Sequence, residues 1–388
     1  MYLSIFRRIL PLVILFAISS CAPMPSLQTQ PRMSGKRVKV GILRNTGIAD
    51  IILNGSFDIK ADKGRAFTYR EGAYTVYASS RGISLNGIVS KAPIALKPYS
   101  EEGFITVNGK DYRGEIIVLI NREGNLNIIN ELELEDYLCG VMKTEISPQW
   151  PVEALKAQAV VSRTYTLKNL GKFKEEGFDL TSTTDCQVYA GMAGESPQTN
   201  RAVQGTRGEV ITYKGELIKA FFHANSGGYT EDVSRVWGMK GPALPYLKGR
   251  RSPYCRNSPH YEWSCTLSKK EIEGILRDAG YKVMGLRKIR ISVKSRSGRG
   301  VQILLYHKGG RTEIQANRFR MLLGTGRIRS TLFQVRDKGE EIEFTGRGWG
   351  HGVGMSQWGA KNMAERGYSY KDIIKFYFPG TRLEKWDE

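Results

Sequence analysis

Residues 137–171 read YLCGVMKTEISPQWPVEALKAQAVVSRTYTLKNLG, and this stretch decides the fold class. Pro151 suits the first position of a helix, and Gly171 suits the residue after its last turn. The residues between them are rich in Ala, Leu, Val and Lys, which favour a helix of about five turns. A single acid, Glu145, precedes this helix, and Arg163 lies inside it. The stretch therefore predicts a helix associated with two charged side chains.

The sequence on either side of this helix has a different period. Over residues 36–134, short apolar runs alternate with polar or small residues and are broken by Gly, Asn and Asp, which is typical of strands and turns. After the helix, residues 179–250 return to short strands. Further elements are expected in the C-terminal part: a helix with a capping box at 268–280, hairpins at 287–310 and 332–348, and a short helix at 369–380. We therefore expect an α+β fold.

The chain is strongly basic. It has 388 residues, a net charge of +20 and a sequence pI of about 9.7. Its length suits one large domain or two ordinary ones, and its charge implies an anionic partner or surface. Nucleic acid, anionic lipid and cell-wall polymers all fit that description, so composition alone does not choose between them.

The N-terminus indicates export. Residues 1–20 combine a basic start with an apolar stretch at 9–18, which suits a secretion signal and is too short for a membrane span. Residues 18–21, ISSC, resemble a bacterial lipobox, so Cys21 is the expected lipid site, with a simple cleaved signal as the alternative. Residues 21–35 then form a flexible tether. We expect an exported, membrane-anchored lipoprotein at the periplasmic or extracytoplasmic face of the envelope, which argues against nucleic acid as a partner.

Each of the two charged residues has two interpretations. Arg163 belongs to a row with Leu155, Ala159 and Leu167, spaced four residues apart on one helix face. In such a row it either meets a carboxylate or a substrate anion, or packs its stem and extends the guanidinium to water. Glu145 is either a surface acid favoured by the helix dipole, or a desolvated acid whose raised pKa suits proton donation. The residues alone leave these alternatives open.

Two stretches combine glycine with ring side chains. In TGRGWGHGVGMSQWG (345–359), alternating glycines let another backbone or a ligand approach closely. FFHANSGGYTED (221–232) has a similar mixture. A site lined by these stretches predicts sugar binding, whereas the alternative is a packed turn with core tryptophans. The candidate substrate-binding residues are His223, Ser226, Tyr229, Trp349, His351 and Gln357.

Four cysteines remain after Cys21, an even number that is compatible with two disulfides in an exported chain. The expected pairs are Cys139 with Cys186 and Cys255 with Cys265. The alternative is zinc, although the spacing matches no strong zinc pattern. We expect no cofactor. Zinc stays an alternative, and its candidate ligands are His223, Cys255, His260 and Cys265.

Five ordered motifs carry a resemblance to the SpoIID/LytB family of peptidoglycan enzymes, which covers residues 36–384. The motifs begin LELEDYLCGVMKTE (132), TSTTDCQVYAG (181), FFHANSGGYTED (221), YLKGRRSPYC (246) and GRGWGHGVGMSQWG (346). By resemblance, Glu145 matches the family's catalytic acid and Arg163 the arginine that the family also needs. Asp185 stands where many members have His. The resemblance implies a β-rich N-terminal part over 36–134 and a SpoIID-like catalytic region, with two interlocked lobes, over 135–388.

The resemblance also implies a reaction. A lytic transglycosylase cleaves the bond between N-acetylmuramic acid and N-acetylglucosamine and leaves a 1,6-anhydro end. One carboxyl serves both steps, whereas hydrolysis uses two, so a lone Glu145 fits lysis better. Glu135 and Asp136, on the strand side, remain candidates for a second acid, with hydrolysis as the alternative. Arg163 is expected near the acid, where it reads the lactyl carboxylate of peptide-stripped strands.

A rival function belongs to another class. The same motifs suit a non-catalytic module that binds glycan strands and enhances a partner, an N-acetylmuramoyl-L-alanine amidase. Retention of both Glu145 and Arg163 favours catalysis over this alternative.

Overall fold

The computed structural model describes residues 35–61, 66–69, 71–100, 102–238 and 244–386, with the main chain alone for 66–69. Contacts separate Met1–Gly35 from a second unit, Lys36–Glu388. The expected signal peptide (1–20), the expected lipid site Cys21 and the expected tether up to residue 34 lie outside the described residues, so they stay predictions. Within the described ranges, no helix is both long and apolar enough to cross a membrane.

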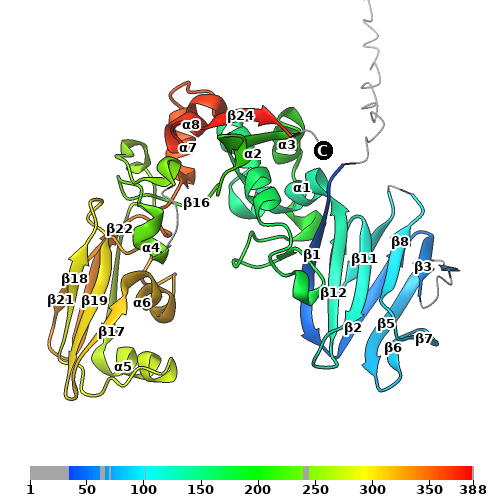
Figure 1. Cartoon of the computed structure of the whole chain (residues 1–388), viewed down its shortest axis with the longest axis horizontal. Coiled ribbons are helices and arrows are strands. Elements are labelled where there is room, and N and C mark those ends of the chain that lie inside the picture. The colour runs from blue at the N-terminus through cyan, green and yellow to red at the C-terminus, as the bar shows by residue number, and fades with distance from the viewer. Residues whose placement is uncertain (1–34, 62–65, 70, 101, 239–243, 387–388) are drawn as a thin grey trace, which may run out of the picture. The chain divides into compact units, whose positions relative to one another are not determined.

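The N-terminal part of the second unit consists of strands, as the alternating pattern predicts (Figure 1). One sheet has the order β13-β1-β12-β11-β8-β3-β4, and the other has the order β10-β9-β2-β5-β6-β7. The antiparallel pair β1–β12 places Val38 opposite Leu132. The strands are β1 (Arg37–Thr46), β2 (Ile48–Asn54), β3 (Phe57–Lys60), β4 (Ala66–Tyr69), β5 (Gly72–Ser79), β6 (Gly82–Leu85), β7 (Ile88–Ser90), β8 (Ile94–Pro98), β9 (Phe104–Val107), β10 (Lys110–Tyr112), β11 (Glu115–Ile120), β12 (Leu126–Glu133) and β13 (Leu180–Thr181).

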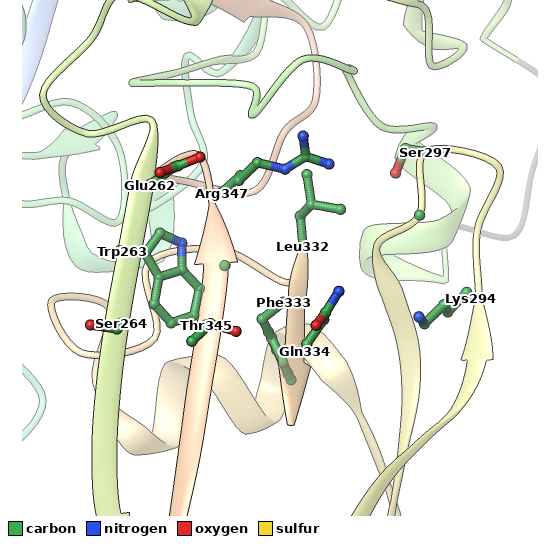
Figure 2. Close-up of a pocket in the computed structure, with 12 residues that line it drawn as sticks. Glu262, Trp263, Ser264, Lys294, Ser297, Leu332, Phe333, Gln334, Thr345 and Arg347 are labelled. Atoms are coloured by element: carbon green, nitrogen blue, oxygen red, sulfur yellow. The ribbon is translucent and has the colours of Figure 1, made fainter. Parts of the chain in front are cut away.

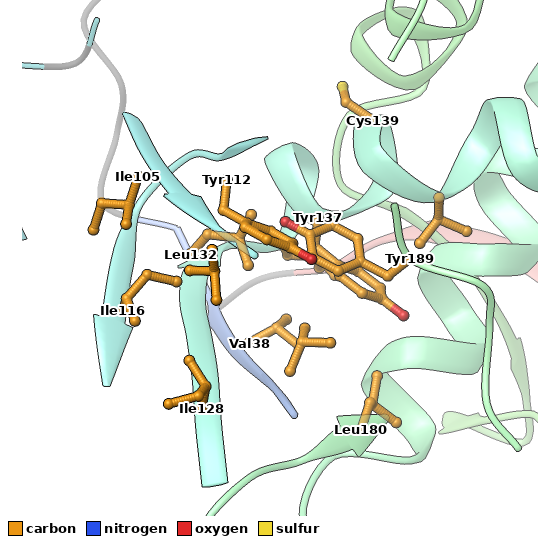
Figure 3. Packing of buried hydrophobic residues seen from close by; sticks show 14 of the residues in the cluster. Val38, Ile105, Tyr112, Ile116, Ile128, Leu132, Tyr137, Cys139, Leu180 and Tyr189 are labelled. Atoms are coloured by element: carbon orange, nitrogen blue, oxygen red, sulfur yellow. The ribbon is translucent and has the colours of Figure 1, made fainter. Parts of the chain in front are cut away.

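Alternating side chains of these strands form the first hydrophobic core (Figure 3). Val38 and Val40 of β1 are fully buried in it. The ring of Tyr137 also lies there, with its centre 5.2 Å from that of Tyr189. Burial of each such side chain contributes roughly 1.5–3 kcal/mol. Tyr137 belongs to the helix after β12, so the boundary expected at 134/135 runs between elements that share one core.

Two helices carry the charged residues singled out in the sequence. The first, α1 (Leu134–Glu145), corrects the expectation that residues 135 and 136 lie on the strand side. Its apolar residues Tyr137, Leu138, Val141 and Met142 share one buried face, a helical pattern too short to stand out beside the preceding strand. The second, α2 (Val152–Lys168), starts one residue after Pro151 and is buried along almost all of its length. The predicted long helix is confirmed.

The C-terminal end of the chain returns to α2 and builds a second core with it. β24 pairs antiparallel with β14, and β23 pairs parallel with β16. The elements between α2 and this return are η2 (Lys174–Glu176), η3 (Gly191–Gly194), α3 (Pro197–Gly205), β14 (Glu209–Tyr213), β15 (Glu216–Leu217), β16 (Phe222–His223), α4 (Val233–Trp237), η4 (Pro245–Leu247) and η5 (Pro253–Cys255), and the returning ones are β23 (Met355–Ser356), α7 (Gln357–Ala364), α8 (Tyr370–Tyr377) and β24 (Arg382–Lys385).

A third core lies within the inserted segment between η5 and β23. Two three-stranded sheets, β17-β22-β21 and β18-β19-β20, enclose it with two helices. Ser268 caps α5 through the main-chain N–H of Glu271, and both expected hairpins form. The elements are β17 (Glu262–Ser268), α5 (Lys269–Asp278), β18 (Lys288–Lys294), β19 (Gly300–His307), β20 (Gly310–Gln315), α6 (Ala316–Leu323), β21 (Phe333–Asp337) and β22 (Glu341–Arg347). The α+β class is confirmed.

Candidate active site

Glu145 is the last residue of α1 and is half-buried. Its Oε1 atom accepts a hydrogen bond of 3.1 Å from the main-chain N–H of Val188. The side-chain amide of Gln357 donates to the main-chain carbonyl of Glu145 at 3.2 Å and also hydrogen-bonds its carboxyl group. Three separate segments, α1, the loop before η3 and the start of α7, therefore hold this one acid.

The surroundings of Glu145 favour its protonated form. Burial raises the pKa of this carboxyl, and the hydrogen bonds from Val188 and Gln357 only partly oppose that shift. The C-terminal end of α1 adds to the effect, because the helix dipole is negative there. No second ionised group contributes to the pKa shift of Glu145 among the described residues. Asp185 is exposed on the same loop as Val188.

A row of aromatic rings begins beside this acid. Trp150 follows Glu145 by five residues, and its ring lies 5.1 Å from that of Trp358, the neighbour of Gln357. The ring of His260 lies 6.1 Å from Trp358 and 4.7 Å from Trp349. All four rings are half-buried, so part of each remains accessible. Aromatic rings with exposed faces suit the apolar faces of sugars, and a row of them suits a polymer.

Arg163 does not lie beside Glu145. Its guanidinium is fully buried and forms a bidentate pair with Glu135, with Nε–Oε1 and Nη2–Oε2 distances of 2.8 and 2.7 Å. It also donates to the main-chain carbonyls of Glu209 and Val203 at 3.1 Å. Glu135 lies in the first turn of α1 and Glu145 is its last residue, a separation of roughly 15 Å along the helix. Of the alternatives left open for Arg163, the structure shows the ion pair with a carboxylate.

This geometry corrects two expectations. Arg163 cannot read a lactyl carboxylate next to Glu145, because its donors are used elsewhere in a buried pocket. Glu135 is not placed to act as a second acid, because its carboxylate is bound to Arg163 at the far end of α1. The single-acid character of the site is therefore strengthened.

The six candidate substrate-binding residues separate into two groups. His223, Ser226 and Gln357 are buried, and the polar atoms of Gln357 face Glu145 and Gln158. Tyr229, Trp349 and His351 are half-buried. The Nδ1 atom of His351 accepts a hydrogen bond of 3.0 Å from the main-chain N–H of Val353. This nitrogen therefore stabilises the glycine-rich loop and is not free to bind a sugar. Of the six, Trp349 and Tyr229 keep the surface that a sugar would need.

His223 and His351 both stay neutral near neutral pH. Burial, together with Arg320 and Arg299, lowers the pKa of His351 to about 3. Burial and the neighbouring His351 lower the pKa of His223 well below its usual value. Neither ring is therefore a proton donor near neutral pH.

Sequence reasoning missed one residue that organises these loops. Arg299 lies at the tip of the β18–β19 hairpin, is fully buried, and donates to the main-chain carbonyl of Ser226 at 2.7 Å. A Cβ at Gly352 would lie 2.7 Å from the guanidinium carbon, so the glycine lets Arg299 approach. At Gly352, the alternating glycines therefore make room for the side chain of Arg299. The Arg-Ser-Gly pattern of residues 295–300 was the available signal.

The expectations for the cysteines are corrected. Cys139, Cys186, Cys255 and Cys265 are all free thiols, so neither expected disulfide forms. Cys255 is buried with its Sγ 3.1 Å from Ser226 Oγ, and Cys265 lies on β17 opposite Phe344. Over the described part of the chain, no group of three or more His, Cys, Asp or Glu side chains is arranged to hold a metal ion, so the zinc candidates do not gather.

Comparison with known proteins places this site in a family. A family model described as stage II sporulation protein matches residues 122–213, which contain both α1 and α2. Stage II sporulation protein D of Bacillus subtilis (strain 168) is 32% identical over 312 residues, covering 76% of this chain and 86% of that protein. The chain belongs to the SpoIID family. The recognition made from the five motifs is confirmed.

Two further relatives extend the comparison for this SpoIID chain. An uncharacterised protein of Brachyspira hyodysenteriae is 40% identical over 290 residues, 73% of this chain and 75% of that protein. A Bacillus subtilis protein named amidase enhancer is 30% identical over 81% of this chain, which spans only 50% of that relative. A domain of unknown function matches residues 245–354. The SpoIID match thus contains Glu145, whereas His260 and Trp349 come from the second matched segment.

Proposed function

We propose that this protein is a lytic transglycosylase that cleaves the MurNAc–GlcNAc bonds of peptidoglycan glycan strands. The observation that carries the proposal is the half-buried carboxyl of Glu145 beside a row of half-buried rings. Its pKa is raised by burial, and none of the described residues contributes a charge to that shift. Membership of the SpoIID family and the relative named amidase enhancer support a role at the cell wall.

The proposed chemistry uses Glu145 twice. The protonated carboxyl first donates its proton to the glycosidic oxygen, and the bond from that oxygen to the muramyl anomeric carbon breaks. The resulting carboxylate then takes the proton of the muramyl 6-hydroxyl, whose oxygen bonds to the anomeric carbon. The carboxyl is regenerated, water does not enter, and a 1,6-anhydromuramyl end forms. An ordinary glycosidase divides these tasks between two carboxyl groups.

The aromatic row would hold the strand in register with the acid. Trp150 and Trp358 lie nearest to it, and His260 and Trp349 continue the row. The guanidinium of Arg329 lies 4.8 Å from the centre of the Trp349 ring and adds a cation at the far end. We propose peptide-stripped glycan strands as the substrate, and Arg163 is not the residue that reads their lactyl carboxylates, because it is buried and paired with Glu135.

Product analysis tests this proposal. Incubation of the protein with purified glycan strands is expected to release fragments with anhydromuramyl ends, each lighter by one water than the hydrolytic product. Mass spectrometry distinguishes the two. Fragments with reducing ends, heavier by one water, would show that the protein hydrolyses the strands and would contradict the proposed lytic reaction. Strands that are bound but not cut would favour the enhancer function.

A pH profile gives the second prediction. Because the acid must start protonated, kcat/KM is expected to fall as pH rises through the Glu145 pKa, which is raised by burial. The hydrogen bond from Gln357 lowers that pKa, so Gln357→Leu is expected to move the falling limb to higher pH. Gln149→Leu, at an exposed turn residue bonded to Ser147, is the control and should move nothing. An unchanged limb in Gln357→Leu would argue against Glu145 as the titrating group.

One observation favours a second function. The amidase enhancer relative supports a chain that binds glycan and stimulates an N-acetylmuramoyl-L-alanine amidase. In that case the row of rings would bind the strand and Glu145 would stay unused. Attachment to the membrane through a lipid on Cys21 is part of either proposal and can be read from the mass of the mature N-terminus.

A further inference from the structure

The basic charge of the chain is concentrated in the segment that supplies the far end of the aromatic row. Residues 245–354 contain 23 Lys and Arg against 9 Asp and Glu, a net charge of +14 out of +20 for the whole chain. His260, Trp349 and Arg329 all belong to this segment. An anionic group of a bound strand is therefore expected at this end of the row, away from the carboxyl of Glu145.

The main pocket of the basic segment is separate from the row. It has a volume of about 730 Å³, and Figure 2 shows its two cations, Lys294 and Arg347, on opposite sides. Arg347 lies over the ring of Tyr261, 5.9 Å from its centre, and donates a long hydrogen bond of 3.4 Å to the hydroxyl of that residue. In the described part of the chain, neither cation lies over a ring of the row. A strand bound on the row therefore meets other cations.

Two cations lie over rings of the row in the described ranges. The Nζ atom of Lys361 lies 5.4 Å from the centre of the Trp358 ring, and the guanidinium carbon of Arg329 lies 4.8 Å from the centre of the Trp349 ring. Lys361 is paired with the carboxylate of Glu365. The guanidinium of Arg329 makes no hydrogen bond and no ion pair with any described residue. Arg329 is therefore the cation of the row whose donors are open to a ligand.

The main chain holds Arg329 beside the glycine-rich loop. Its carbonyl accepts hydrogen bonds from the main-chain N–H of Gly350, at 2.8 Å, and from Nε of the buried Arg320, at 3.1 Å. Gly350 directly follows Trp349, so these bonds tie the segment of the cation to the segment of the ring. The side chain of Arg329 is half-buried against that ring. A side chain restricted in this way loses little freedom when a ligand binds.

A guanidinium that stacks on a ring keeps its edge for a planar anion. Stacking uses the face of the group, whereas the N–H groups at its edge match the two oxygens of a carboxylate. The hydroxyl and acetamido groups of a glycan strand are uncharged. The lactyl group of a muramyl residue carries a free carboxylate once its stem peptide has been removed. That carboxylate is the anion that a stripped strand presents to the row.

We propose that Arg329 binds the lactyl carboxylate of a stripped muramyl residue and is the residue through which the protein selects such strands. The inference rests on the proposed function for the identity of the strand. Arg329 and Glu145 lie at opposite ends of the row, so the carboxylate belongs to a muramyl residue other than the one that is cut. A stem peptide converts the same carboxylate to a neutral amide, which leaves the guanidinium without an ionic partner.

Binding of two matched ligands tests this assignment without cleavage. One is the stripped strand, and the other is the same strand with its lactyl carboxylates converted to methyl amides. Glu145→Gln serves as the background protein, because it should bind strands without cutting them. Titration calorimetry is expected to show at least about tenfold tighter binding of the acid strand. Arg329→Gln in this background should lose that preference and bind the methyl amide strand as before.

Arg327→Gln in the same background is the matched control. Arg327 lies two residues before Arg329, is exposed, and pairs with Glu271. The substitution removes the same charge from the same segment but away from the row, so the preference for the acid strand should remain. An equal loss of preference in both variants would overturn the assignment to Arg329. A background protein that binds the two strands equally, or binds neither at millimolar concentration, would overturn it as well.

His260 provides a local readout of the bound carboxylate. Burial and the neighbouring Arg329 lower the pKa of its imidazole. A carboxylate paired with Arg329 opposes the effect of that cation, so the pKa of His260 should be higher with the acid strand bound than with the methyl amide strand. Histidine ring signals followed by NMR measure both values. Because the two strands bury the ring alike, equal pKa values would contradict the proposal.

Cleavage by the wild type is measured separately on the same two strands. A protein that prefers the acid strand through Arg329 but cuts neither strand contradicts the proposed function alone. A protein that releases anhydromuramyl ends from both strands with equal kcat/KM, and binds them equally, contradicts the role of Arg329 alone.

Discussion

Glu145→Gln is expected to abolish anhydromuramyl product, with a loss of at least about 10³-fold in kcat. The amide has nearly the same shape as the acid and can accept the hydrogen bond from Val188, so the local structure should hold. It cannot donate a proton to the glycosidic oxygen or take one from the 6-hydroxyl. Both steps depend on this one group, so its loss stops both. Mass spectrometry of digested strands measures the effect.

A matched substitution separates chemistry from charge. Glu216 is exposed on β15, and Glu216→Gln removes the same charge away from the site. It should digest strands like the wild type, and both variants should unfold at the same urea concentration as the wild type. If Glu145→Gln kept its activity, the catalytic assignment would fail and Asp185 would become the next acid to examine. If it lost activity and still bound strands, the rings would be shown to bind independently of the acid.

Much of the fold could be predicted from the sequence because its signals are local. The alternation of residues 36–134, the Ser268 cap and the two C-terminal hairpins each correspond to a formed element. The helix α1 was missed because its apolar face is short and directly follows β12. The free cysteines could not be predicted, because pairing depends on the distance between elements far apart in the chain.

The candidate site shows where pattern reasoning ends. The sequence indicated that Glu145 and Arg163 matter, and the family motifs contain both. Arg163 and Glu145 are separated by the length of α1 because Arg163 of α2 pairs with Glu135 in the first turn of α1. This packing of α1 against α2 is a tertiary contact that no sequence pattern indicates. Burial of His223 and Ser226 has the same origin, because the glycine-rich loop and the tip of the β18–β19 hairpin enclose them. The rings of Trp150 and Trp349, far apart in sequence, form one row only in the fold.

Arg163→Ala is expected to destabilise the protein by about 3–5 kcal/mol. The guanidinium is fully buried, and its removal leaves the Glu135 carboxylate and two main-chain carbonyls without their donor. The stability of Arg163→Lys should lie between those of the wild type and Arg163→Ala, because an ammonium keeps the charge but loses the bidentate geometry. Urea denaturation followed by circular dichroism measures both. Lys156→Ala, at a half-buried pair with Glu153 on the same helix, is the control and should change stability by about 0.5 kcal/mol or less.

A double variant distinguishes a structural arginine from a catalytic one. If Arg163 stabilises the fold through Glu135, then Arg163→Met combined with Glu135→Leu should recover part of the lost stability, because no buried charge is left unpaired. The recovered protein should also cleave strands, since Glu145 and the aromatic row lie at the other end of α1. An inactive double variant with recovered stability would instead assign Arg163 to the reaction and require α1 and α2 to move when the strand binds. A structural role for Arg163 thus predicts an active double variant, and a catalytic role predicts an inactive one of the same stability. The activity of the double variant therefore decides why Arg163 lies in α2.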